Sequence, residues 1–299
     1  MKVIKGKTHA LGDGFVVTRF LPDARVRSVG PFVFFDYFGP VTFPPGRGID
    51  VRPHPHIGLA TVTYLFEGSQ MHRDTLGSVQ EITPGDVNWM TAGRGIAHSE
   101  RTGPTAREQG HNLHGIQTWV GLPTAHEEAE PHFQHFKGAD LPTRHENGLD
   151  ARMIVGEAYG LASPVKTFSP IFYADLTFEA GSSFHYATEH EERGFFVIDG
   201  EIQAAFEGKG VIGFAAGSMA ALDPGEEVSL YTDYPARVIL FGGAPLDGPR
   251  HLWWNFVSSS KERIERAKQD WQNGVFGLIP GDDKEFIPLP EDKRTEDKK

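Results

Sequence analysis

Three histidines and one glutamate form two short pairs that could together bind a metal ion. His54 and His56 alternate with prolines, and His98 and Glu100 follow a glycine-containing turn. Each pair has the spacing i, i+2, which on a β-strand puts both side chains on one face, about 6–7 Å apart. If two such strands pair, cross-strand neighbours lie about 4.5–5.5 Å apart at Cβ, so all four side chains can reach a common point. Imidazole nitrogens and a carboxylate oxygen around one point are typical of a transition-metal site.

The chemistry of these ligands restricts the metal but does not select one. The chain has no cysteine, so any metal must be held by nitrogen and oxygen. Three neutral imidazoles and one carboxylate leave two open positions on an octahedral divalent ion, which suits reaction with a substrate and dioxygen. We expect Fe(II), with Mn, Ni and Cu as alternatives. Zn also suits the donors, but a four-ligand structural zinc site normally has no open position.

Short strands must position these residues. The 35 glycines and 21 prolines are spread through the chain and separate short runs rich in β-branched or alternating apolar residues, for example 61–66, 116–120, 171–176 and 237–241. This pattern predicts an all-β sandwich or barrel. A strand, a Gly turn, a strand and a Pro-Gly turn occur once in each half, with Pro-Gly at 84–85 and again at 224–225. The repetition predicts two copies of one β-barrel unit.

Signals for strands lapse in the polar stretch 136–147, which we interpret as the boundary between the two units. The predicted organisation is an N-terminal metal-binding barrel over 1–136, a C-terminal barrel over 137–250, and a docking helix with a charged tail over 251–299. In the second barrel His185 and His190 have i, i+5 spacing, and no histidine follows its Pro-Gly turn until His251. We therefore expect this barrel to be metal-free.

One helix is well marked near the end of the chain. Ser259 and Glu262 form a capping-box pattern at the start of a helix predicted over 259–272. Its apolar residues Ile264, Ala267 and Trp271 have helical spacing. Gly274 stands where a C-terminal cap would. The aromatic residues just before the helix, Trp253 and its neighbours, are expected to pack it onto a barrel.

Composition excludes several functions. The net charge is −11, from 29 basic and 40 acidic residues, and no basic block precedes the tail. Direct nucleic-acid binding, which needs a basic surface, is therefore not expected. No apolar stretch approaches the roughly 20 residues of a membrane span, and the N-terminus has no signal-peptide pattern, so we expect a cytoplasmic protein without membrane contact.

Four runs of sequence resemble the pirin family of the cupin superfamily, over about 12–274. They are His54-Pro55-His56-x-Gly58, Pro84-Gly85-Asp86, Trp89-Met90-Thr91-Ala92-Gly93-Arg94-Gly95-Ile96-x-His98-x-Glu100 and His114-Gly115-Ile116-Gln117-x-Trp119-Val120. The resemblance implies an all-β fold of two tandem cupin (jelly-roll type) β-barrels with a C-terminal α-helix. It also implies one metal, usually iron, in the N-terminal barrel, with His54, His56, His98 and Glu100 as ligands.

Two functions follow from the resemblance. Some pirins cleave flavonols such as quercetin with dioxygen, so we expect a quercetin 2,3-dioxygenase-like enzyme acting on a small aromatic enol. Glu100 would then be a ligand and a possible base. The alternative is a non-enzymatic, iron-dependent redox-sensing regulator that binds a protein partner.

Several further positions are weaker candidates. His114 and Gln117 match the family and would line the pocket, although ordinary strand positions are the simpler interpretation. His72 and Arg94 are candidates to support the metal ligands. Many cupins and pirins have a glutamate where this chain has Ala60, a difference that we expect to alter the surroundings of the ligands and the volume of the pocket.

Overall fold

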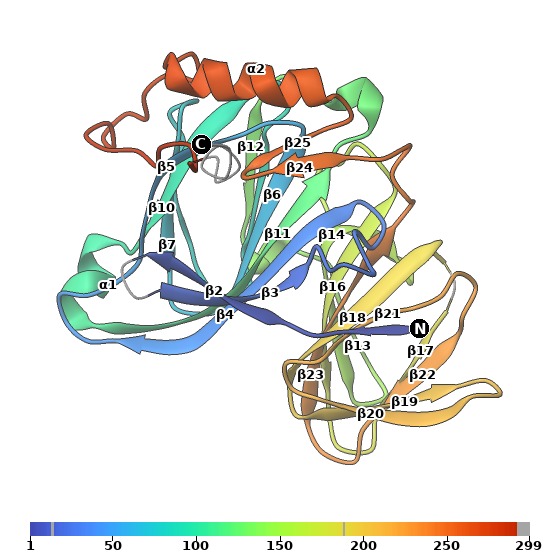
Figure 1. Ribbon diagram of the computed structural model, residues 1–299. Helices are drawn as coiled ribbons and strands as arrows, with labels where there is room; N and C mark the ends of the chain where they lie inside the picture. The colour runs from blue at the N-terminus through green and yellow to red at the C-terminus, as the bar shows by residue number, and fades with distance from the viewer. Residues whose placement is uncertain (13–14, 188, 292–299) are drawn as a thin grey trace, which may run out of the picture.

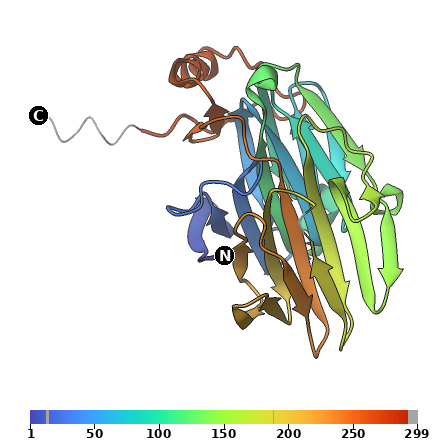
Figure 2. The ribbon, with the colours of Figure 1, turned by 90° about the vertical axis from the view of Figure 1, so that its right-hand side faces the viewer.

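The computed structural model describes residues 1–12, 15–187 and 189–291, and it contains two β units side by side (Figure 1). Each unit consists of one large and one small antiparallel sheet, so the chain contains two similar β units, as the repeated turn pattern predicted. The strands of the two large sheets run alongside one another in Figure 2. The fold is thus all-β, as expected.

The first unit holds the histidine pairs. Its large sheet has the order β12 (His132–Phe136), β9 (Val87–Thr91), β6 (Leu59–Glu67), β11 (His111–Gly121), β4 (Phe32–Phe43), β3 (Phe15–Leu21) and β2 (Lys7–Gly12). Its small sheet has the order β5 (Asp50–His56), β10 (Ile96–Arg101), β7 (Gln70–Asp74) and β8 (Val79–Ile82). Buried apolar residues from both sheets, including Phe15 and Ile82, pack between them.

The second unit repeats this plan. Its large sheet has the order β1 (Lys2–Ile4), β21 (Met219–Ala221), β18 (Glu192–Asp199), β23 (Ala236–Gly243), β16 (Ile171–Phe178), β14 (Leu149–Ala158) and β13 (Thr143–Glu146), with β15 (Leu161–Ala162) beside β14. Its small sheet has the order β17 (Ser183–Tyr186), β22 (Val228–Tyr231), β19 (Glu201–Phe206) and β20 (Gly210–Ala215). Because β1 joins this sheet, the chain begins in the second unit before it forms the first. The boundary at 136/137 remains a prediction.

An apolar core joins the two large sheets back to back. It includes Phe35 and Val62 from the first unit and Tyr173 and Phe241 from the second. Ala60 belongs to this core and is fully buried in it. The expectation that Ala60 alters the metal pocket is therefore wrong, because successive side chains of a strand face opposite sides and Ala60 faces the second unit.

The helices lie at the ends of the sheets. They are α1 (Pro104–Gln109), η1 (Thr124–His126), η2 (Gly138–Asp140) and α2 (Lys261–Gln272). Helix α2 lies across the top of the first unit in Figure 1, beside the hairpin of β24 (His251–Trp253) and β25 (Phe256–Ser258). Ile264 and Ala267 are buried against Phe256, with Trp253 and Trp271 packed around them. The aromatic cluster therefore attaches the helix, as predicted.

The start of α2 differs from the prediction by one residue. Ser260, not Ser259, is the N-cap, and its side chain accepts a hydrogen bond from the Arg263 amide. Ser259 is unavailable because its hydroxyl donates to Glu127. Gly274 has φ +72° immediately after the helix, as expected for its C-terminal cap. None of the helices in the described part of the chain is long and apolar enough to cross a membrane.

A glycine next to the first histidine pair is expected to be indispensable. Gly58 has φ +66°, and a Cβ there would lie 2.0 Å from the Val257 carbonyl oxygen. Gly58→Ala should lower the free energy of unfolding by about 3 kcal/mol, from the left-handed backbone and the backbone clash together. Gly46→Ala is the matched control, since Gly46 has φ +83° but no atom within 4 Å of the added Cβ. It should cost only about 1 kcal/mol. If denaturant unfolding shows the same loss of stability in Gly58→Ala and Gly46→Ala, the predicted backbone clash at Gly58 is wrong.

Candidate metal centre and cavity

Pairing of β5 with β10 brings the two short sequence pairs together. The strands are antiparallel, with His98 opposite His54 and Ile96 opposite His56. Beyond this point β5 contains one extra residue, so that Glu100 is opposite Val51 on β5, whereas β10 pairs without interruption with β7, where Glu100 is opposite His72. The i, i+2 spacing therefore acts as predicted for the histidines, and the bulge in β5 lies opposite the segment between His98 and Glu100.

The three histidines converge. Ligand nitrogens of His54, His56 and His98 lie within 4.8 Å of one another, and all three side chains are buried. The Nε2 atoms of His56 and His98 are 3.1 Å apart. Two nitrogens bound about 2.1 Å from one metal at a right angle would be about 3.0 Å apart. This geometry fits a transition-metal ion.

Hydrogen bonding and burial keep the rings in the form that binds a metal. His54 Nδ1 lies 2.8 Å from the Arg52 carbonyl oxygen, and His56 Nδ1 lies 3.0 Å from that of Asn255. Because a carbonyl only accepts, each Nδ1 carries the proton and each Nε2 keeps its lone pair. Burial lowers the pKa of His54 to about 4 and the pKa values of His56 and His98 well below the ordinary value. Neutral imidazoles are the metal-binding form.

Glu100 is not part of the group formed by the three histidines, whose ligand nitrogens all lie within 4.8 Å of one another. Its Oε1 accepts hydrogen bonds from Gln117 Nε2 at 2.9 Å and from the Thr63 hydroxyl at 3.3 Å. Burial raises the pKa of this carboxyl above its ordinary value. Glu100 is thus oriented by neutral donors and faces the same cavity as His54 and His56.

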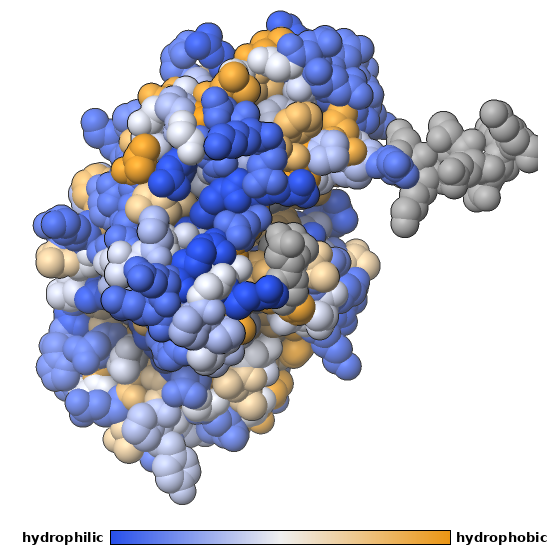
Figure 3. All heavy atoms as spheres, turned by 90° about the vertical axis from the view of Figure 1, so that its left-hand side faces the viewer, coloured by the Kyte–Doolittle hydropathy of each residue, from blue (hydrophilic) through white to orange (hydrophobic). Residues whose placement is uncertain are grey.

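A cavity of about 560 Å³ leads to this cluster. Its walls include Phe34 and Trp119, whose rings stack with centroids 3.8 Å apart, and Trp119 contacts His56 edge-on. The Arg19 guanidinium lies 4.2 Å from the Phe34 centroid and forms a bidentate pair with Asp36. The cavity is thus large enough for a small organic ligand, and aromatic side chains form part of its wall. The side of the molecule in Figure 3 is mainly hydrophilic, with apolar residues in small groups.

The remaining predicted site residues lie in different places. Gln117 lines the cavity, and His72 is buried next to His98, with 3.4 Å between their Nδ1 atoms. His114 does not reach the cavity: its Nε2 contacts the Tyr37 hydroxyl, and its ring packs on Phe66. Arg94 pairs with Glu130 on the surface and does not support the ligands.

Histidines of the second unit are not brought together. His185 is exposed on β17, with its nearest carboxylate, Glu227, at 3.7 Å. His190 lies against the Glu157 carbonyl and stacks on Phe172. Among the described residues, the only group of three potential ligands in mutual contact is His54, His56 and His98.

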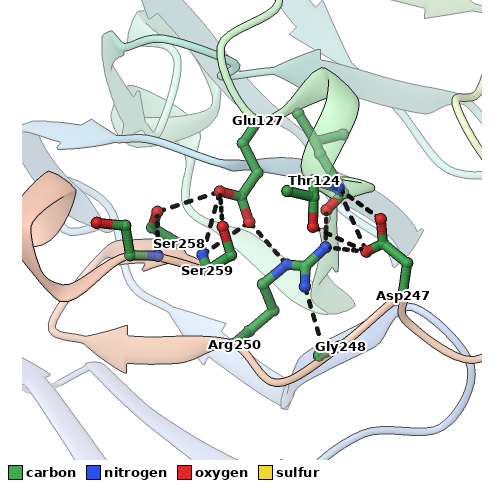
Figure 4. Close-up of polar contacts among 9 residues, drawn as sticks. Thr124, Glu127, Asp247, Gly248, Arg250, Ser258 and Ser259 are labelled. Atoms are coloured by element: carbon green, nitrogen blue, oxygen red, sulfur yellow. Dashed lines mark hydrogen bonds and ion pairs between the residues drawn. The ribbon is translucent and has the colours of Figure 1, made fainter.

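A polar cluster that the sequence did not reveal supports the site from outside (Figure 4). Buried Glu127, just after η1, accepts hydrogen bonds from the hydroxyls of Ser258 and Ser259 and from the Ser259 amide. It also pairs with buried Arg250 at 2.7 Å. Both ends of the β24–β25 hairpin are therefore held, and the hairpin supplies the Asn255 carbonyl that orients His56.

The fold and the site together define a two-domain cupin whose first domain contains three converging histidines that could hold a metal ion. The pirin family model matches residues 14–120, and the model for the pirin C-terminal cupin domain matches 173–277. The chain belongs to the pirin family.

Relatives in other organisms align over nearly the whole chain. It is 48% identical to a pirin-like protein of Caulobacter vibrioides, over 97% of this chain and 99% of that protein. It is 33% identical to pirin of Rattus norvegicus, over 92% of each. The crystal structure of a quercetin 2,3-dioxygenase from Acinetobacter baumannii superposes with a TM-score of 0.89 at 35% identity, covering 98% of this chain and 96% of that one.

Proposed function

We propose that this pirin is a metal-dependent dioxygenase that cleaves quercetin-like flavonols or related enols. The observation that carries the proposal is the cavity of about 560 Å³ whose lining includes His54, His56 and Glu100, next to an aromatic wall. Similarity to the Acinetobacter quercetin 2,3-dioxygenase supports it. A structural metal would need no organic-sized cavity beside it.

His54, His56 and His98 are the proposed ligands, with Glu100 as a fourth when it turns toward the ion, and Fe(II) is the proposed metal. When bound, such an ion supplies a Lewis acid and a one-electron redox partner for dioxygen. The three imidazoles contribute no charge, so Glu100 is the carboxylate that reduces the charge of the ion. Mn, Ni and Cu remain the alternatives, and Zn would not do redox chemistry.

The residues around the cavity have separable roles in the proposal. The apolar and aromatic side chains that line the cavity, Trp119 among them, would contact a planar aromatic substrate. Glu100 would accept the proton of the substrate's enol hydroxyl, since its carboxyl faces the cavity and burial raises its pKa above the ordinary value. Gln117 and Thr63 would hold the Glu100 carboxylate in place through the bonds they donate to Oε1.

Oxygen uptake tests the proposal directly. Protein reconstituted with Fe(II) should consume oxygen when quercetin is added, and metal-free protein treated with a chelator should not. The quercetin absorption band should disappear in step with oxygen. Uptake equal to that of the metal-free protein would reject the dioxygenase and favour the alternative, an iron-dependent regulator whose oxidation state changes its affinity for a protein partner.

Replacing the proposed base should separate proton transfer from metal binding. In Glu100→Gln, the three histidines remain and the amide has nearly the same shape, so metal content should stay near that of the wild type. Turnover should fall about 100-fold, because the amide cannot accept the substrate proton. Steady-state kinetics and metal analysis of the same preparation measure both quantities. Unchanged turnover would exclude Glu100 as the base, and loss of the metal would identify it as an essential ligand.

A further inference from the structure

His98 differs from the other two histidines in what lies behind its ring. His54 and His56 each donate Nδ1–H to a backbone carbonyl. His98 Nδ1 instead lies 3.4 Å from His72 Nδ1, and His72 Nε2 lies 3.0 Å from Asp74 Oδ2. His98 and Asp74 are 0% exposed and His72 is 4% exposed, so water does not substitute for these contacts.

The Asp74 carboxylate determines which atom donates in each of these hydrogen bonds. An ionised carboxylate only accepts, so His72 Nε2 must donate to Asp74. Neutral His72 then presents an unprotonated Nδ1, which can only accept from His98 Nδ1–H. A His98 that is protonated at Nδ1 has its lone pair at Nε2, the atom that lies 3.1 Å from His56 Nε2.

His72 and Asp74 are each held in place by further contacts. Asp74 Oδ1 accepts the amides of Leu76 and Ser78 at 2.9 and 3.0 Å, which leaves Oδ2 for His72. The ring of His72 stacks on Phe133, with 4.4 Å between centroids and 10° between planes. Neither ring nor carboxylate is free to turn without losing these contacts.

We propose that Asp74 and His72 are positioning residues that fix the tautomer of His98 and strengthen its binding of the metal. The inference rests on the proposed metal site and adds residues to it that touch neither metal nor substrate. A carboxylate at the end of the chain makes the ring of His98 a better donor than a neutral carbonyl could. Among the three ligands, His98 alone would have this support.

Asp74→Asn is the decisive variant because an amide at position 74 can reverse the direction of the hydrogen bonds that run from His98 through His72. The Asn oxygen can still accept the Leu76 and Ser78 amides, which directs its NH₂ group toward His72 Nε2. His72 must then carry its proton on Nδ1 and donate to His98 Nδ1, leaving a proton on His98 Nε2 where the metal should bind. We expect Co(II), used as a spectroscopic probe, to bind about 10–100-fold more weakly in a chelator competition. In the Zn(II)-loaded wild type, ¹⁵N NMR should show the proton of His98 on Nδ1.

Controls separate this effect from simple loss of structure. Asp86→Asn changes another buried aspartate of the first unit, which accepts bonds from Thr83 and Gly138, and it should leave Co(II) affinity unchanged. His72→Gln retains an acceptor for His98 and should bind Co(II) within a few-fold of the wild type, whereas His72→Phe should resemble Asp74→Asn. If Asp74→Asn fails to fold, the comparison of His72→Gln with His72→Phe tests the same inference.

Two results would overturn the inference in different ways. Wild-type affinity in Asp74→Asn or in His72→Phe would show that the chain does not position His98, and would leave the dioxygenase proposal intact. Failure of the wild type itself to bind Co(II) or Zn(II) would remove the metal site, and the proposed function with it.

Discussion

His98→Ala is expected to abolish stoichiometric metal binding, with an affinity at least about 100-fold below that of the wild type. The variant removes one of the three buried histidine ligands, and His54, His56 and Glu100 would have to hold the ion without it. The nearest imidazole behind it, His72, is already paired with Asp74. Since loss of a supporting partner alone costs about 10–100-fold in affinity, loss of a ligand should cost more. Quercetin-dependent oxygen uptake should disappear together with the metal.

His114→Ala is the matched control for this prediction. His114 belongs to the same unit and packs among aromatic residues, but it does not line the cavity. Its removal should leave the metal content and the oxygen uptake close to those of the wild type. Metal analysis after dialysis, together with a thermal melt to confirm folding, measures both variants. A His98→Ala protein that retains one metal per chain would exclude the three-histidine centre.

Glu127→Ala is expected to destabilise the protein by about 3–5 kcal/mol, the usual cost of leaving a buried charge without its partner. The Arg250 side chain is only 3% exposed and would lose its buried carboxylate, keeping exposed Asp247 and the carbonyls of Leu122 and Gly248. The Ser258 and Ser259 groups that bond to Glu127 would lose their acceptor too. Denaturant unfolding measures the loss, which should exceed that of any other variant considered above.

The neighbouring glutamate provides a direct comparison. Glu128 pairs with Arg263, but its side chain is 59% exposed, so Glu128→Ala should cost less than about 1 kcal/mol. Metal affinity should also separate the two variants. Loss of Glu127 frees the hairpin that supplies the Asn255 carbonyl to His56, and Co(II) should bind several-fold more weakly. Equal stability of the two variants would show that the Glu127 cluster does not anchor the hairpin.

Local patterns in the sequence were sufficient for much of the fold and for the three histidines. The i, i+2 spacing specifies one face of a strand whatever the strand pairs with, and β5 and β10 do pair. The turn signals predicted two similar units, and the N-cap of the helix was predicted to within one residue. Such features depend on neighbours in the chain, which the sequence displays directly.

Features that depend on distant segments could not be read in this way. Ala60 was interpreted as part of the pocket, yet it faces the second unit. The partner that covers each face of β6 is decided only when the sheets assemble. Glu100 accepts hydrogen bonds from Gln117 and Thr63, which lie 17 and 37 positions away in the chain, so its surroundings could not be predicted from neighbouring residues. Neither such a contact nor a back-to-back packing has a signal in the run of residues that contains it.

The sequence by itself determined which atoms could bind a metal, because three histidines and the absence of cysteine restrict the donors to nitrogen and oxygen. Tertiary structure alone decided how those atoms are held. The carbonyl that orients His56 comes from Asn255, 199 positions away, and the hairpin carrying it is tied to Glu127, itself 131 positions from Ser258. Hydrogen bonds over such separations form only when the whole chain has packed, since burial and pairing, not local spacing, bring the groups within reach.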